Sequence, residues 1–96
     1  TIVRILFTAE DDKAVFDETK KLYQELKTES AGNRDYVYLN AMRSPVNRIK
    51  NKSRYQILMR IYPENADSII EHIYKLVESV SKDVQCFVEI NPQSLN

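Results

Sequence analysis

The chain has 96 residues, a formal net charge of zero, 43% apolar residues and 29% charged residues. This length suits one domain, and the charged content and the lack of any apolar run near the ~20 residues of a membrane-spanning helix argue against a membrane protein. The single cysteine, Cys86, excludes an internal disulfide and is typical of a reducing cytoplasm. We expect a single domain over residues 1–96 and, since the chain does not start with Met, a fragment of a larger protein.

The first predicted strand covers residues 2–8. Its odd-numbered apolar residues are expected to face the core, because Arg4 on that side would be buried without a partner. A helix then begins near Asp11, which follows Thr8 at the spacing of a capping box, and it ends near Ser30. Four residues at spacings of four, three and four form its predicted buried face: Val15, Thr19, Leu22 and Leu26.

Residues 36–39 are β-branched and aromatic and predict the second strand. Residues 42–53 predict a loop, because Pro45 interrupts a regular element and the segment is rich in Asn, Ser and basic residues. The third strand is predicted over residues 54–62. Tyr55 alternates with the apolar residues of that strand, which places it in the core rather than at the surface as a base-stacking platform.

The second helix is predicted from Asn65 to Val80, where apolar residues keep helical spacing. Residues 84–90 alternate as a fourth strand, so the element order is β-α-β-β-α-β. Two helices on one face of a four-stranded, mostly antiparallel sheet make an α+β, two-layer sandwich of the ferredoxin-like type. This is the predicted fold class.

The charge is unevenly distributed along the chain. Residues 9–29 contain seven acidic residues and four lysines, whereas residues 42–62 contain six basic residues and no acidic one. A flexible basic segment can follow a phosphate backbone by releasing counterions, without reading bases. The alternative is a solvated loop without a ligand. The predicted DNA-binding residues are Arg43, Arg48, Lys50, Lys52, Arg54 and Arg60.

No residue pattern predicts catalysis. His72 is expected to lie exposed on the second helix without the oriented partner that an acid or base needs. Cys86 alternates onto the core side, where a free cysteine is usually a small apolar residue. The acidic run over residues 10–12 is explained as a helix start. One glycine cannot form a phosphate-binding glycine-rich loop, and one cysteine with one histidine cannot complete a zinc site, so no metal or cofactor is expected in this chain.

The sheet face away from the helices is predicted to be partly apolar. Such a face favours a partner surface or the docking of another domain. The alternative is a set of scattered surface aromatics, which are common. The residues expected on this face are Arg4, Leu6, Tyr36, Tyr38, Gln56, Leu58, Arg60, Phe87 and Glu89.

Several segments carry a resemblance to a known family. They read Ser-Pro-Val-Asn-Arg-Ile-Lys over residues 44–50, Arg-Tyr-Gln-Ile-Leu-Met-Arg over 54–60 and Val-Glu-Ile-Asn-Pro-Gln-Ser over 88–94, and the opening residues 3–11 also fit. In this order and spacing they resemble the C-terminal domain of the PriA family of primosomal replication-restart DNA helicases (primosomal protein N′). The likeness covers essentially the whole chain.

The resemblance implies a parent helicase that unwinds DNA at stalled forks in the 3′ to 5′ direction with ATP and Mg, and that carries a zinc module elsewhere. It implies that this domain is a cytoplasmic DNA-contacting scaffold whose fold is similar to that of a small-subunit ribosomal protein. The implied partners are forked and single-stranded DNA, single-stranded-DNA-binding protein, other primosome proteins and the helicase lobes of the same chain, with no membrane. Lys52 and Gln56 match the family's basic residue and Gln that hold the acidic tail of single-stranded-DNA-binding protein.

Two other functions are compatible with the predicted topology. An RNA-recognition-type binder stacks bases on aromatic residues of its central strands, but the outward residues expected on the first and third strands here are not aromatic. A small enzyme or metabolite sensor on the same fold is the other alternative, and it lacks an evident site.

Overall fold

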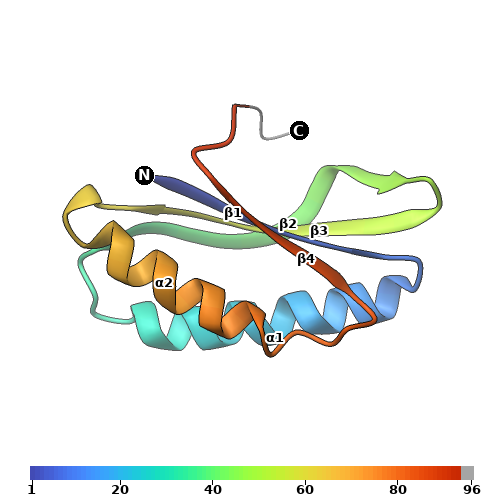
Figure 1. The fold of residues 1–96 in the computed structure, drawn as a ribbon, viewed down its shortest axis with the longest axis horizontal. Helices are drawn as coiled ribbons and strands as arrows, with labels where there is room; N and C mark the ends of the chain where they lie inside the picture. The colour runs from blue at the N-terminus through green and yellow to red at the C-terminus, as the bar shows by residue number, and fades with distance from the viewer. Residues whose placement is uncertain (94–96) are drawn as a thin grey trace.

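The computed structural model describes residues 1–93 and, at positions 46–48, the backbone without the side chains. The four strands form one antiparallel sheet in the order β2-β3-β1-β4, and both helices cover the same face of it (Figure 1). The predicted α+β two-layer sandwich is therefore confirmed. The elements are β1 (Ile2–Ala9), α1 (Asp12–Ser30), β2 (Tyr36–Ile49), β3 (Lys52–Ile61), a 3-10 turn (Pro63–Asn65), α2 (Ala66–Val77) and β4 (Gln85–Ile90).

The ends of α1 lie where the sequence predicts them, although the N-terminal cap differs. Asp11 is itself the capping residue, since its Oδ1 accepts a hydrogen bond from the backbone N–H of Lys13 at 3.1 Å. Thr8 lies within β1, so the predicted Thr8–Asp11 capping box is wrong. Beyond Ser30 the chain turns through Gly32 at a φ of +74°, a conformation that glycine adopts without steric cost.

The prediction of a loop over residues 42–53 is wrong, because β2 continues to Ile49 and returns through a two-residue turn into β3. Lys50 and Asn51 of that turn have φ values of 51° and 65°, as in the type I′ turns of tight hairpins. Pro45 is tolerated because β2 is an edge strand, and because the β2–β3 register shifts between Arg43 and Arg48. In Figure 1 this green part of β2 arches away from β3.

A second irregularity in β2 changes which residues face the helices. The register between β2 and β3 also shifts between Tyr36 and Tyr38. Tyr36 is therefore half-buried and packs against the core, whereas Tyr38 lies on the opposite face and is 43% exposed. The placement of Tyr36 on the open face was wrong, because strict alternation fails at a bulge.

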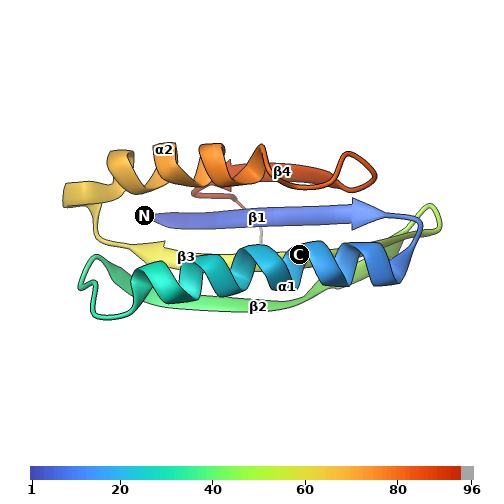
Figure 2. The same cartoon turned by 90° about the horizontal axis from the view of Figure 1, so that it is seen from below.

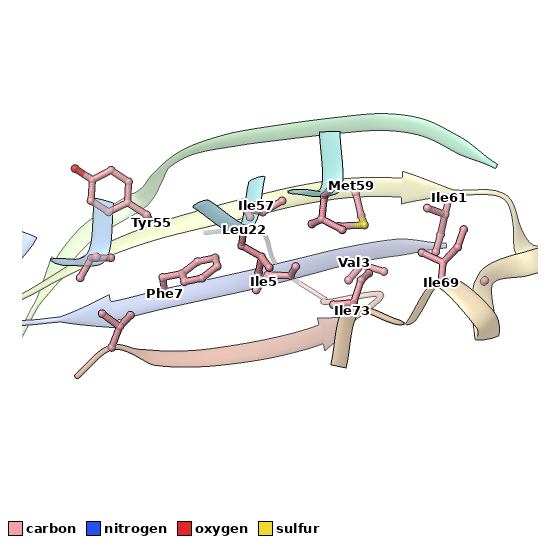
Figure 3. Close-up of a cluster of buried hydrophobic side chains, with 14 residues drawn as sticks. Val3, Ile5, Phe7, Leu22, Tyr55, Ile57, Met59, Ile61, Ile69 and Ile73 are labelled. Atoms are coloured by element: carbon pink, nitrogen blue, oxygen red, sulfur yellow. The ribbon is translucent and has the colours of Figure 1, made fainter. Parts of the chain in front are cut away.

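The core lies between the sheet and the two helices (Figure 3). Alternate residues of β1 and β3 supply one side of it, and the predicted face of α1 and part of α2 supply the other. Burying each large apolar side chain stabilises the fold by about 1.5–3 kcal/mol. The members that are no more than 2% exposed are Val3, Ile5, Phe7, Val15, Leu22, Leu26, Ile57, Met59, Ile61 and Ile73.

The second helix is shorter than predicted. A 3-10 turn over Pro63–Asn65 leads into α2, which ends at Val77 rather than Val80. Its buried residues are Ala66, Ile69 and Ile73, so its apolar stripe packs on the sheet as expected. Within residues 1–93, neither helix combines the length and the apolar character needed to cross a membrane.

Candidate functional site

The predicted basic segment forms a β-hairpin rather than a loop. We call residues 44–54 the hairpin arm. Lys50 is exposed at its turn, and Lys52 and Arg54 are partly exposed at the start of β3. Neither Lys50 nor Lys52 forms an ion pair with any residue that the structure describes. The backbone of Arg48 pairs opposite Ser53, and its side chain lies outside the described residues.

Alternation along β3 sets the direction of the arm's charges. Tyr55 belongs to the buried core on the helix side of the sheet, so Lys52 and Arg54 project to the opposite, open face. An antiparallel hairpin holds its side chains at a fixed spacing, unlike a flexible loop. The arm is therefore a pre-formed basic edge at one end of the sheet.

Arg43 differs from Lys50 and Lys52 because a described carboxylate already matches its charge. Its guanidinium stacks 4.8 Å from the centre of the Tyr55 ring, and its Nη1 lies 3.3 Å from Asp12 Oδ1. The Tyr55 hydroxyl also donates to Asp12, at 3.3 Å. Arg43 thus links the start of α1 to the base of the arm, a role that the sequence did not indicate.

These contacts shift the titration of Asp12. Hydrogen bonding from Ser53, followed by the charge of Arg43, lowers the pKa of Asp12 below its ordinary value of 3.8. Burial and the nearby Asp12 carboxylate raise the pKa of Tyr55. The carboxylate is thus the favoured form of Asp12 in the folded protein.

We expect Asp12→Asn to destabilise the protein at neutral pH, with an effect that disappears in acid. Because the folded-state pKa of Asp12 is lowered, its charged form contributes stability above 3.8, and this contribution is lost as the pH falls through the folded pKa. Urea unfolding of both proteins at neutral pH and at successively lower pH tests this. If the free energies of unfolding of the wild type and Asp12→Asn differed by the same amount at every pH, the prediction would be wrong.

Arg60 lies far from the arm. It is eight residues along β3 from Lys52, a separation of about 26 Å at the usual rise of a strand. It is exposed beside Tyr38, at a shallow cavity of about 380 Å³ that Ile2 and Leu58 also line. The six predicted DNA-binding residues thus divide into the arm residues, the Asp12-bound Arg43 and the remote Arg60.

Lys52 and Gln56 share the open face but occupy different environments. Lys52 lines a cavity of about 550 Å³ together with Glu10, Asp11 and Lys82. Gln56 is only 2% exposed, and its Oε1 has no hydrogen-bond partner among the described residues. Their Cα atoms are about 13 Å apart at the usual rise of a strand. A ligand that contacts both residues would have to reach the buried amide of Gln56.

The open face of the sheet is only partly exposed. Arg4 and Leu6 in β1 are buried, and Arg4 donates two hydrogen bonds to Glu89, from Nε to Oε1 at 3.1 Å and from Nη2 to Oε2 at 2.9 Å. Phe87, paired with Leu6 across the strands, is 50% exposed. Exposed apolar residues of this face thus lie on the edge strands, at Tyr38, Ile49 and Phe87.

The other chemically distinctive residues are in structural positions. His72 is exposed, and its Nε2 lies 2.6 Å from Glu29 Oε2, which joins α2 to α1. Burial, followed by the nearby Glu18 charge, raises the pKa of the Cys86 thiol to about 12, so the thiol stays protonated at neutral pH. Across residues 1–93, no three His, Cys, Asp or Glu side chains are grouped as a metal site requires.

A groove between α1 and β2 was not predicted from the sequence. The groove has a volume of about 540 Å³, and Phe16 in its wall is 46% exposed with its ring edge-on to Tyr55 at 5.8 Å. Its α1 wall includes the first four members of a stripe of alternating lysine and aromatic residues at spacings of three and four, a pattern that helical periodicity could have identified. This α1 stripe is Lys13, Phe16, Lys20, Tyr23 and Lys27.

Comparisons with known proteins support the fold and give no function. No protein-family model and no curated protein sequence matches the chain. Among solved structures, the chain is similar to the de novo designed protein Foldit4, with 13% identity, 97% of each chain covered and a TM-score of 0.59. It also matches the de novo designed protein Ferredog-Diesel, with 19% identity, 94% of this chain and 85% of that chain covered and a TM-score of 0.47. The likeness to Foldit4 agrees with the α+β sandwich described above.

Proposed function

We propose that this chain is a non-catalytic DNA-binding and protein-interaction domain of a cytoplasmic, replication-restart DNA helicase. The carrying observation is the hairpin arm, a basic β-ribbon whose Lys50 and Lys52 have no ion-pair partner in the described part of the chain. The family resemblance of the arm and of the closing strand supports the helicase context. In this proposal ATP, Mg and zinc act in other domains of the parent protein.

The arm suits contact with the phosphates of forked or single-stranded DNA. A tight turn presents Lys50 at the tip, and Lys52 follows two residues later on the open face at the start of β3. Lysine ammonium groups on flexible stems bind phosphates as point charges and release counterions. Such contacts give affinity that depends on salt and tolerates any base sequence.

The same face supports the second part of the proposal, an interaction with the acidic tail of single-stranded-DNA-binding protein. Lys52 supplies the positive charge, and the amide Nε2 of Gln56 is the group that would donate to a tail carboxylate, since the unpartnered Oε1 is an acceptor. A carboxylate accepting hydrogen bonds from a lysine and an amide is a chemically stable arrangement. Other primosome proteins and the helicase lobes of the parent chain are the further proposed partners.

We expect the Lys50→Ala, Lys52→Ala double variant to bind fork DNA more weakly and with less salt dependence. Loss of two phosphate contacts should lower the slope of log affinity against log salt by about 1.5–2. Fluorescence anisotropy with a labelled fork across a salt series measures the slope. The matched control is Lys21→Ala, Lys75→Ala, which removes the same charge from exposed positions on the two helices and should keep the wild-type slope.

Two results would contradict the proposal. One is an absence of binding to forked or single-stranded DNA at low salt. The other is a slope that falls equally in the arm variant and in the helix control, since that would mean that net charge and not the arm determines binding.

A further inference from the structure

The outer edge of β2 has open backbone hydrogen-bonding groups. β2 is the end strand of the sheet and pairs with β3 on one side only (Figure 2). The N–H of Ala41 donates to the side-chain Oδ1 of Asn40 at 2.9 Å, so it points away from β3. Because the direction alternates along a strand, the backbone groups of Leu39 and Arg43 point outward as well. This stretch pairs with β3 in regular register over residues 38–43.

The groove between α1 and β2 lies directly beside this edge. Ala41, Met42 and Arg43 line its strand side, and members of the α1 stripe line its helix side. Figure 2, seen from the helix side, shows α1 running along β3 and β2 with β2 outermost. A strand added to the β2 edge would direct every second side chain toward the helix layer, into this groove.

The charge of the groove is mainly positive. Lys13, Lys20 and Arg43 line it, against one lining acid, Asp12, which pairs with Arg43. Lys13 makes an exposed contact of 3.4 Å with Asp17, an arrangement that is worth little in water. Lys20 forms no ion pair within residues 1–93. An occupant with carboxylates would therefore complement the groove.

We propose that the β2 edge and the α1 stripe bind an extended acidic peptide of a partner protein by strand addition. This site is distinct from the hairpin arm and goes beyond the proposed DNA binding. Main-chain hydrogen bonds to Leu39, Ala41 and Arg43 would provide affinity, and the groove would select side chains. Asn40 would release the N–H of Ala41 to the incoming strand, since its amide now covers the open edge.

The spacing of the α1 stripe defines the peptide. Lys13, Phe16 and Lys20 succeed one another about 5 Å apart along the helix axis. Residues on one face of a strand are about 6.7 Å apart. Three alternate residues of the peptide would therefore face Lys13, Phe16 and Lys20. Their side chains should be a carboxylate, an apolar group and a second carboxylate. A peptide satisfies the outward N–H and C=O groups in register, which a nucleic-acid strand cannot do, and its apolar residue covers Phe16.

The test uses a short fluorescein-labelled peptide with glutamate, isoleucine and glutamate at alternate positions and serine between them. A second peptide has lysine in place of both glutamates. We expect the first to bind the protein and the second not to bind. The Lys13→Glu, Lys20→Glu variant should bind the first peptide at least about tenfold more weakly, because two favourable charge contacts become repulsive. The matched control is Lys21→Glu, Lys75→Glu, two charge reversals at exposed positions outside the stripe, which should bind like the wild type.

A second variant tests the backbone contact. Ala41→Pro removes an N–H that points away from β3 and should abolish peptide binding, and edge strands accept proline. Its thermal unfolding is measured beside that of the wild type, to show that the variant folds. If Ala41→Pro does not fold, Phe16→Ala replaces it, because Phe16 is half-exposed and its removal should also weaken peptide binding. The Lys50→Ala, Lys52→Ala arm variant should bind the peptide normally, which separates this site from the proposed DNA-binding site.

Three results would overturn the proposal. Equal binding of the acidic and basic peptides would show that charge does not select the occupant. The groove would be assigned to nucleic acid if the wild type bound labelled fork DNA, the stripe variant did not, and the acidic peptide bound neither protein. The β2 edge would be assigned to a second copy of the chain if the protein dimerised at higher concentration, Ala41→Pro abolished the dimer, and the acidic peptide did not compete with it.

Discussion

Replacing Phe7 with alanine is expected to lower the free energy of unfolding by about 3–5 kcal/mol. Phe7 is fully buried at the centre of the sheet, where it pairs with Tyr55 on one side and Cys86 on the other. Its removal deletes apolar contacts and leaves a cavity that the rigid sheet cannot close. Because a small domain is stable by only about 5–15 kcal/mol, this variant should be near its unfolding threshold. Urea denaturation followed by circular dichroism measures the change.

Phe87→Ala is the matched control for this experiment. It makes the same chemical change on the other face of the sheet, at a ring that is 50% exposed beside Leu6. Its expected cost is about 1 kcal/mol or less, because half of the ring is already in water. A similar large loss in both variants would show that the open face is as tightly packed as the helix face, contrary to the exposure of Phe87.

The helices and the central strands could be predicted from the sequence because local periodicity determines them. The spacing of apolar residues in α1 predicts a helix with one buried side. All four residues of that side are buried, namely Val15, Thr19, Leu22 and Leu26. The outer half of β2 could not be predicted in this way. Pro45 and the polar residues around it are unfavourable for a strand, and only pairing with β3 and a position at the sheet edge make one possible.

The site residues were predicted by charge, and charge does not show which cations are already paired. Arg43 and Asp12 are 31 residues apart in the chain and meet only because α1 starts beside the base of the arm. Alternation placed Gln56 correctly on the open face, yet it could not show that the amide is almost fully buried there. The groove was missed because its two walls come from a helix and an edge strand whose proximity is a tertiary property.

The ion pair on the open face leads to the second large prediction. Arg4 is not expected to be buried without a partner, and in the structure it is 6% exposed with a bidentate contact to Glu89. Glu89→Ala should cost about 2–4 kcal/mol, because it leaves a guanidinium in the protein interior without its counter-charge. The lower end of this range reflects the carboxylate itself, whose side chain is 37% exposed. Thermal and urea unfolding measure the loss.

The double variant Arg4→Met, Glu89→Met distinguishes two effects. One is the cost of leaving the buried Arg4 charge unpaired, and the other is the net contribution of the ion pair to the free energy of unfolding. Replacing a buried ion pair with apolar residues of similar volume is often neutral or stabilising. We therefore expect the double variant to lie within about 1 kcal/mol of the wild type and well above Glu89→Ala. If it were as unstable as the single variant, the pair would contribute net stability in its own right.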